Sequence, residues 1–306
     1  MRWTTADIPP QDGRVAIVTG SNTGLGFETA AELAIAGATV VLACRDKAKA
    51  AVAADSIRSR TKNGDVEVLA LDLGDLASVR DAAAETLERW PRIDLLIDNA
   101  GVMIPPKSTT ADGFELQFGT NHLGHFAYTG LVLDGLTSTP GSRIVVVSSI
   151  AHRDGRMRWD DLQWERSYNR MAAYSQSKLA NLLFTFELDR RLRLAELPTI
   201  ALAAHPGVSS TELARHIPGA NLPGIKQVVG GLLSATLNSA ADGALPSLRA
   251  ATDPDAMGGA YYGPNGFREM RGDPVLVMPS PHAVREPDWA RLWAISEELT
   301  DVTYGI

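Results

Sequence analysis

The sequence predicts an α/β fold in which helices cover both faces of a doubly wound parallel sheet. Uninterrupted apolar segments suited to buried strands alternate with helical segments along most of the 306 residues. A glycine-rich turn follows the first predicted strand and leads into the first predicted helix. No internal repeat or low-complexity linker divides the chain, so we expect a single domain over residues 1–306.

The first half of the chain alternates strands and helices in a regular order. Residues 14–19 form an uninterrupted apolar strand, and the helix at 27–36 ends at Gly37, a residue suited to a C-terminal cap. Asp46 and Asp75 are expected to cap the helices that follow them, because aspartate favours the N-cap position. The elements predicted here are strands at 39–43, 66–70 and 93–97, and helices at 47–60 and 75–90.

The second half continues this alternation with longer helices. Residues 171–194 contain no Pro or Gly and are rich in Leu, Ala and Arg, which predicts one long helix. The other elements predicted here are helices at 114–133, 227–250 and 288–299, and strands at 143–148, 199–204 and 259–262. A loop rich in Pro and Gly is expected at 207–224.

Composition and charge narrow the class of protein. The chain is 45% hydrophobic and 21% charged, as in an ordinary globular protein with a substantial core, and its net charge of −7 argues against nucleic-acid or anionic-membrane partners. The single cysteine, Cys44, excludes an intrachain disulfide and suits a reducing compartment. Residues 1–7 lack an apolar signal core, and no run of 18 apolar residues suggests a membrane span. We therefore expect a cytoplasmic protein.

The turn at residues 20–26 has the arrangement of a phosphate-binding loop. Between a strand and a helix, backbone N–H groups and the helix N-terminus can hold a pyrophosphate. Glycines allow the backbone to approach the phosphates without a Cβ atom in the way. The residues predicted to bind are Gly20, Ser21, Asn22, Thr23, Gly24, Leu25 and Gly26. As a bare pattern, the same turn also fits a purely structural role.

Tyr174 and Lys178 lie four residues apart on the long predicted helix, which places their side chains on one face. A phenol has a pKa near 10, and a nearby cation favours its ionised form. The pair can then donate or accept a proton close to neutral pH. The spacing alone is weak evidence, since a solvated helix face explains most such pairs.

Polar and turn-forming residues follow four of the predicted strands. These are Asp72, the sequence Asn99-Ala100-Gly101, Ser149, and Pro206-Gly207. Each has an ordinary explanation as a turn or loop residue. In a doubly wound sheet, however, ligands bind in the crevice beyond the carboxyl ends of the strands. The set as a whole therefore predicts a binding site at that edge.

In order and spacing, these motifs resemble the short-chain dehydrogenase/reductase family from about residue 14 to about residue 211. The details that resemble its retinol-dehydrogenase-like branch are Asn22-Thr23-Gly24, Ala43-Cys44-Arg45-Asp46, Asn121-His122-Leu123-Gly124-His125-Phe126, and Ser148-Ser149 followed by Ala151-His152. The resemblance implies a Rossmann-type fold. It also implies an NAD(P)-dependent oxidoreductase that interconverts an alcohol and a carbonyl by hydride transfer, without a metal.

The resemblance also assigns roles to single residues. Tyr174 is the implied general acid/base, and Lys178 lowers the tyrosine pKa and binds the nicotinamide ribose. Ser149 orients the substrate oxygen, and Asn121 holds a water beside the lysine. The remaining implied cofactor contacts are Asp72 (against the adenine), Leu73, Asn99, Ala100, Gly101, Pro206, Gly207, Val208 and Thr211 (near the nicotinamide carboxamide). Asn99 also has an implied role in bracing the sheet.

The end of the second strand predicts a preference for NADP(H), with NAD(H) as the alternative cofactor. NAD-dependent relatives place an aspartate there, which accepts from the ribose 2′-hydroxyl and repels a 2′-phosphate. This chain has Cys44 at that place and Arg45 next, whose guanidinium suits a phosphate. Asp46 takes the aspartate role only if the strand ends later.

Several features keep more than one interpretation. The insertion at 151–170 is either a surface excursion or a pocket wall, and residues 207–225 are either an ordinary loop or a lid over an apolar substrate. A homodimer or larger oligomer is expected through the helix that carries Tyr174. The competing functions are a non-catalytic NAD(P)-binding regulator and a nucleotide-sugar epimerase or dehydratase. The sequence names neither the substrate nor the physiological direction.

Overall fold

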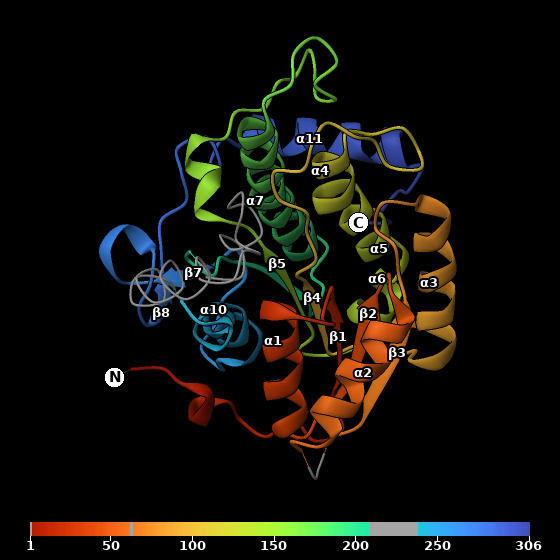
Figure 1. Ribbon diagram of the computed structural model, residues 1–306, viewed down its shortest axis with the longest axis vertical. Coiled ribbons are helices and arrows are strands. Elements are labelled where there is room, and N and C mark those ends of the chain that lie inside the picture. The colour runs from red at the N-terminus through yellow and green to blue at the C-terminus, as the bar shows by residue number, and fades with distance from the viewer. Residues whose placement is uncertain (1, 62–63, 209–237) are drawn as a thin grey trace, which may run out of the picture.

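The computed structural model describes residues 2–61, 64–208 and 238–306. Its centre is an eight-stranded sheet in the order β3-β2-β1-β4-β5-β6-β7-β8 (Figure 1). Strands β1 to β7 pair in parallel, and β8 pairs antiparallel with β7. The predicted doubly wound, Rossmann-type α/β fold is confirmed.

The strands are β1 (Val15–Thr19), β2 (Thr39–Cys44), β3 (Val66–Ala70), β4 (Leu95–Asp98), β5 (Arg143–Val147), β6 (Ile200–Ala204), β7 (Tyr261–Pro264) and β8 (Pro274–Leu276). The α-helices are α1 (Gly24–Ile35), α2 (Lys47–Arg58), α3 (Leu76–Arg89), α4 (Leu116–Phe118), α5 (Gly124–Leu131), α6 (Leu133–Thr137), α7 (Arg170–Leu194), α10 (Ala240–Thr252) and α11 (Glu286–Thr300). A π-helix, η2, spans Gly119–Leu123, and short 3₁₀ helices are η1 (Thr5–Asp7), η3 (Ile150–Asp154) and η4 (Phe267–Glu269).

The sheet is buried on both faces because its strands direct alternate apolar side chains to opposite sides. In β1, Ala16 and Val18 pack with α1, α2 and α10, whereas Ile17 packs on the other face with α3, α5 and α7. Figure 1 shows α1, α2 and α10 in front of the sheet. This packing explains why the strands read as continuous apolar segments.

The predicted caps are confirmed. Asp46 accepts a hydrogen bond from the backbone N–H of Lys49, and Asp75 accepts from two backbone N–H groups of α3. Gly37 follows α1 with φ of 105°, a conformation that favours glycine. Asp46 lies outside β2 and caps α2, and β2 ends at Cys44, one residue later than predicted.

Several element boundaries differ from the prediction. Helix α1 begins at Gly24 rather than residue 27, so the glycine turn supplies its first residues. The predicted helix at 114–133 begins at Leu116, after its N-cap Glu115, and continues through the π-helix into α5, which ends at Leu131. In the described part of 227–250, helix α10 starts only at Ala240, after its cap Ser239. The edge strand β8 was not predicted, since three residues carry little pattern.

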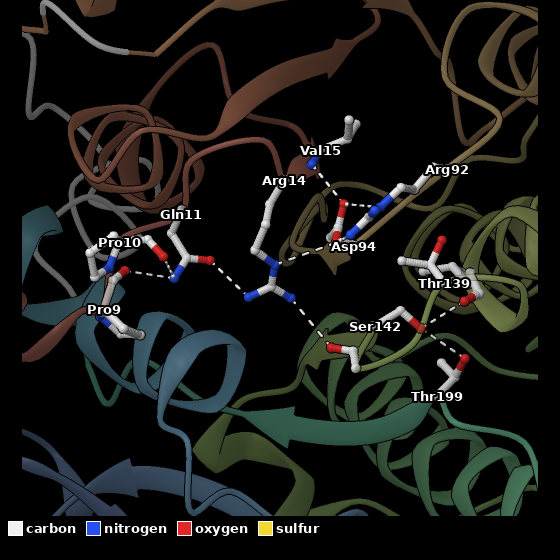
Figure 2. A network of polar contacts seen from close by, with 12 residues as sticks. Pro9, Pro10, Gln11, Arg14, Val15, Arg92, Asp94, Thr139, Ser142 and Thr199 are labelled. Atoms are coloured by element: carbon white, nitrogen blue, oxygen red, sulfur yellow. Dashed lines mark hydrogen bonds and ion pairs between the residues drawn. The ribbon is translucent and has the colours of Figure 1, made fainter.

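Polar side chains tie together the strand starts, at the edge of the sheet opposite the carboxyl ends (Figure 2). Asp94 accepts from the backbone N–H of Val15 at 3.0 Å and pairs with Arg92 at 2.9 Å. Its carboxylate also lies 3.6 Å from the Nε atom of Arg14. The Nη1 atom of Arg14 donates to Gln11 at 2.9 Å. This network fixes the start of β1 beside the start of β4.

Among the described residues, no helix combines the length and the apolar character needed to span a membrane.

Candidate active site

A cavity of about 360 Å³ opens at the carboxyl ends of β1 to β5, where the strand order reverses between β1 and β4. Such a reversal is where doubly wound folds bind their ligands. The predicted residues that line it are Gly20, Asn22, Thr23, Gly24, Leu25, Gly26, Arg45, Asp72, Leu73, Asn99, Ala100, Gly101, Tyr174 and Lys178. The fold therefore brings five separate stretches of sequence to one site.

The N-terminus of α1 faces this cavity and suits an anion. The N-cap residues of α2, α3, α7 and α10 accept hydrogen bonds from their own helices, but the Thr23 side chain makes no capping hydrogen bond on α1. The first backbone N–H groups of a helix have no partner within the helix. Here they are left to a ligand, and the helix dipole favours a negative one.

Glycines are required on both sides of this turn. Gly20 has φ of 65°, and a Cβ atom there would lie 2.8 Å from the Cβ of Ala100. Gly24 has φ of 64°, and a Cβ atom there would meet nothing within 4 Å. The turn thus packs closely against the loop after β4 while Gly24 borders open space. The residues present fit the pyrophosphate of a dinucleotide.

Tyr174 and Lys178 lie side by side on α7, as their spacing predicted. The Lys178 Nζ atom is 5.9 Å from the centre of the Tyr174 ring, and both residues line the cavity. Both are buried, at 2% and 4% exposure respectively. Nζ donates to the Val147 carbonyl at 2.9 Å, which fixes the ammonium at the end of β5. A fixed cation beside a phenol is the arrangement that proton transfer at the phenol needs.

Asn121 lies in the π-helix behind the loop that follows β4. Its Oδ1 accepts from the Val102 N–H at 2.7 Å, while Nδ2 donates to the Val102 carbonyl at 2.9 Å and to Ser177 at 3.0 Å. A Cβ atom on Gly101 would lie 3.2 Å from Asn121 Oδ1 and 3.5 Å from Lys178 Nζ. Asn121 therefore lies next to the lysine and holds the loop there, without lining the described cavity.

Of the two serines after β5, Ser148 lines the cavity and Ser149 does not. Ser149 is 5% exposed, and its Oγ accepts from the backbone N–H of Ala151 at 3.2 Å, which caps η3. Ser148, which the sequence did not single out, lines the cavity and donates to the Lys178 carbonyl at 2.7 Å. Ser148 thus joins β5 to α7, while Ser149 stands at the start of the next loop.

Positive side chains surround the cavity at the end of β2. Arg45 is highly exposed, and its Nε lies 3.9 Å from an Asp72 oxygen. Lys49, one turn into α2, also lines the cavity and pairs with Asp46 at 2.7 Å. Burial raises the pKa of the Cys44 thiol, although hydrogen bonding with Ser21 opposes this, so the thiol stays neutral. No carboxylate directly follows β2, where an aspartate would repel a phosphate.

Some predicted residues are not brought to this cavity. Ser21 is buried, and its hydroxyl donates to the Val18 carbonyl at 2.8 Å. Pro206, Gly207 and Val208 lie beyond the cavity's lining, at the end of β6. Thr211 and the predicted lid beyond residue 208 lie outside the described residues.

The insertion at 151–170 packs on the loop around α4. Trp164 is buried and accepts from Lys107 at its carbonyl, and the Tyr168 hydroxyl bonds to both Glu115 and Gln117. No insertion residue lines the described cavity.

Several lining residues were missed by the sequence analysis. They are Ala43, Lys49, Leu71, Val102, Met103, Thr120, Val147 and Ser148; Cys44 and Asp46, which the sequence analysis placed at the end of the second strand, also line the cavity. Most directly flank predicted positions, so their place beside a strand end was the available signal. In the described part of the chain, no group of three or more His, Cys, Asp or Glu side chains is arranged to hold a metal ion.

Residues 14–221 match the protein-family model described as short chain dehydrogenase. The chain belongs to the short-chain dehydrogenase family. It is 45% identical to human retinol dehydrogenase 13 over 299 residues, covering 96% of this chain and 86% of that protein. It is 42% identical to human retinol dehydrogenase 12, covering 98% and 90% of the two chains. These likenesses place the chain in the retinol-dehydrogenase-like branch of the family.

Solved structures show the same fold. A crystal structure of an uncharacterised protein from Mycobacterium paratuberculosis matches with a TM-score of 0.83 and 44% identity, covering 100% of both chains. RhlG of Pseudomonas aeruginosa, solved as an NADP active-site complex, matches with a TM-score of 0.63 and 25% identity, covering 82% of this chain and 96% of that one. The chain is thus an NAD(P)-dependent short-chain dehydrogenase acting on CH–OH groups.

Proposed function

We propose that this short-chain dehydrogenase interconverts an apolar alcohol and its aldehyde or ketone with NADP(H), using Tyr174 as general acid/base. The observation that carries the proposal is the buried Tyr174–Lys178 pair in the cavity beneath the glycine turn. When bound, the nicotinamide supplies or accepts the hydride. Tyr174 gives a proton to the substrate oxygen or takes it back, and Lys178 stabilises the phenolate.

An apolar substrate is supported by the relatives, since the retinol in their names is an apolar alcohol. Purified protein should be screened with NADPH against aldehydes and ketones of graded polarity by following NADPH absorbance. Consistent preference for sugars over apolar carbonyls would contradict this part of the proposal.

Replacing Tyr174 by Phe tests the chemistry. The variant keeps the ring and its packing but removes the proton donor, so we expect kcat to fall by about 10²–10⁴-fold, the usual contribution of a general acid. NADPH affinity should stay nearly intact, because the cofactor keeps its other contacts. Turnover of carbonyl substrates by Tyr174→Phe at the wild-type rate would refute the role assigned to the tyrosine.

The preference for NADP(H) rests on the cations at the end of β2. Arg45 and Lys49 both line the cavity there, while Asp46 caps α2 and pairs with Lys49. Charge-assisted hydrogen bonds contribute roughly 1.5–3 kcal/mol each, so Arg45→Ala should weaken NADPH binding by about 10- to 100-fold. NADH binding should hardly change. Titrating both cofactors into the wild type and the variant checks this, and equal affinity of the wild type for the two cofactors would disprove it.

We also propose a cytoplasmic location and a homo-oligomeric state. The location is supported by the single, buried Cys44. Leu179, Leu182, Leu183 and Phe186, the apolar residues of α7 expected to meet a second copy, are buried within the described chain. An oligomer must therefore use another surface.

A further inference from the structure

We propose that Glu269 is a positioning residue that links the loop after Ser149 to residues 206–208 and so sets the geometry of the reacting end of the active site. The inference rests on the proposed function and on the roles that the family resemblance implies for Ser149, which orients the substrate oxygen, and for residues 206–208, which contact the cofactor. These two segments follow different strands, β5 and β6, and both lie beyond the bond from the Ser148 N–H to the Ala204 carbonyl, at 2.7 Å, where the parallel ladder ends. Some other contact must hold them in register.

The two carboxylate oxygens of Glu269 bind one partner on each segment. Oε1 accepts from Arg153 Nη2 at 2.6 Å, and Arg153 lies in η3, directly after Ser149. Oε2 lies 3.1 Å from Nε2 of His205, which precedes residues 206–208. His205 is fully buried, and its Nδ1 accepts from the Gly207 N–H at 3.2 Å. That bond places the imidazole proton on Nε2, so His205 donates to Glu269.

The backbone around Glu269 reinforces both connections. The Met270 carbonyl, next in the chain, accepts from the Val208 N–H at 2.9 Å. A Cβ atom on Gly207 would collide with the same carbonyl, so the contact requires glycine there. On the other side, Arg153 Nη2 also donates to the Met278 carbonyl at 3.0 Å. The segment from η4 to Met278 thus contacts both active-site segments at once.

The local backbone is strained where Glu269 is held. Arg268 and Glu269 have φ of 51° and 57°, two successive left-handed conformations at residues other than glycine. Such conformations are unfavourable for residues with a Cβ atom and tend to persist at functional sites. A carboxylate held this way is oriented before any ligand binds.

The Glu269 carboxylate remains charged at every pH at which the enzyme would be assayed. Burial raises the pKa of Glu269, but hydrogen bonds from His205 and Arg153 outweigh it and bring the pKa to about 2. Burial lowers the pKa of His205 despite its bond to Glu269. The link is therefore one ionised carboxylate between a guanidinium and a neutral imidazole.

Glu269→Gln tests the link with little change in shape. A glutamine can accept from Arg153 or from His205, but its NH₂ group cannot accept from the other. We expect kcat to fall by about 10- to 100-fold, the cost of a small misplacement of reacting groups. The deuterium isotope effect on kcat, with NADPH labelled at C4, should rise as hydride transfer becomes slower. NADPH affinity should stay within about twofold, because the adenosine end is untouched.

Arg268→Gln is the matched control. It lies in the same strained turn and receives the same new side chain, and its guanidinium lies 5.5 Å from the centre of the neighbouring Phe267 ring. It should leave kcat and the isotope effect unchanged. An equal loss of kcat in both variants, or a Glu269→Gln enzyme with the wild-type kcat and isotope effect, would overturn the proposal.

Hydrogen exchange tests the link without using activity, and so separates its failure from failure of the proposed reaction. In Glu269→Gln, the amides of Gly207 and Val208 and those of η3 should exchange about tenfold faster, since a charge-assisted bond to each segment is weakened. Arg268→Gln should match the wild type. Unchanged exchange in either segment of Glu269→Gln would refute the link whatever the substrate proves to be.

Discussion

Asp98, the last residue of β4, is fully buried directly before the cofactor-lining Asn99. Its Oδ2 accepts from Thr129 at 3.0 Å, but its Oδ1 has no hydrogen-bond partner among the described residues. Burial raises the pKa of Asp98 to about 8, with the Thr129 bond acting in the opposite direction. The folded protein therefore holds this carboxyl protonated at neutral pH, whereas the unfolded chain ionises it.

This difference predicts a pH-dependent stability. Because the folded pKa is raised, the stabilisation from Asp98 is full below its unfolded pKa near 4 and is lost as pH rises toward 8. Between pH 5 and 7 the wild type should lose about 1.4 kcal/mol of unfolding free energy per pH unit from this group. Asp98→Asn should lack that slope. Denaturant unfolding of both proteins from pH 5 to 9 checks it, and parallel curves would contradict the burial argument.

Among the elements of the fold, the carboxyl ends of the strands bind the ligand, whereas the strand starts stabilise the sheet. The carboxyl ends of the strands form the cavity, and the strand starts are joined by the Asp94 network of Figure 2. Asp94 is buried, at 2% exposure of its side chain, and contacts Arg14, Arg92 and the backbone of β1. Loss of the Asp94 carboxylate leaves the partly buried guanidinium of Arg14 without its main counter-charge.

Asp94→Ala should therefore destabilise the fold by about 1–3 kcal/mol, because it leaves the Val15 N–H without its hydrogen-bond acceptor and the Arg14 guanidinium without its ion-pair partner. The kcat of the folded protein should not change, because the cavity lies at the opposite edge. Asp55→Ala serves as the control: it breaks the exposed pair with Arg58 and should cost less than about 1 kcal/mol. Chemical denaturation measures the unfolding free energy of both variants. Equal losses would show that burial of the Asp94 carboxylate does not matter.

For the whole molecule, α11 determines which surface is free for assembly. It packs on α7 and α5. Its Trp293 is 2% exposed, lies 5.2 Å from the Phe126 ring centre and carries Arg191 over its face at 4.3 Å. The chain's own last helix therefore covers part of α7.

We therefore propose that the expected oligomer forms through another face. Light scattering at micromolar concentration should give a mass that is a multiple of 32.7 kDa. Arg191→Ala, which uncovers Trp293 within the chain, should lower stability without changing that mass. A single species of 32.7 kDa in the wild type would refute the oligomer.

The sequence by itself determined the parallel sheet, the glycine turn and the pairing of Tyr174 with Lys178. These features depend on periodicities of two and of 3.6 residues, on glycine at positive φ and on helix spacing, all of which act between near neighbours. For the same reason Asp46 was correctly predicted as a helix cap, because its partner Lys49 is three residues away.

Only the tertiary structure decided the contacts between distant segments. It showed that α7 is buried by α11, and that Glu269 contacts both Arg153 and His205 across 116 and 64 residues. No local sequence pattern predicts such pairs, because each residue, taken with its sequence neighbours alone, fits an ordinary loop or surface position. They arise when the order of the strands brings chain segments together, and that order is a property of the folded whole.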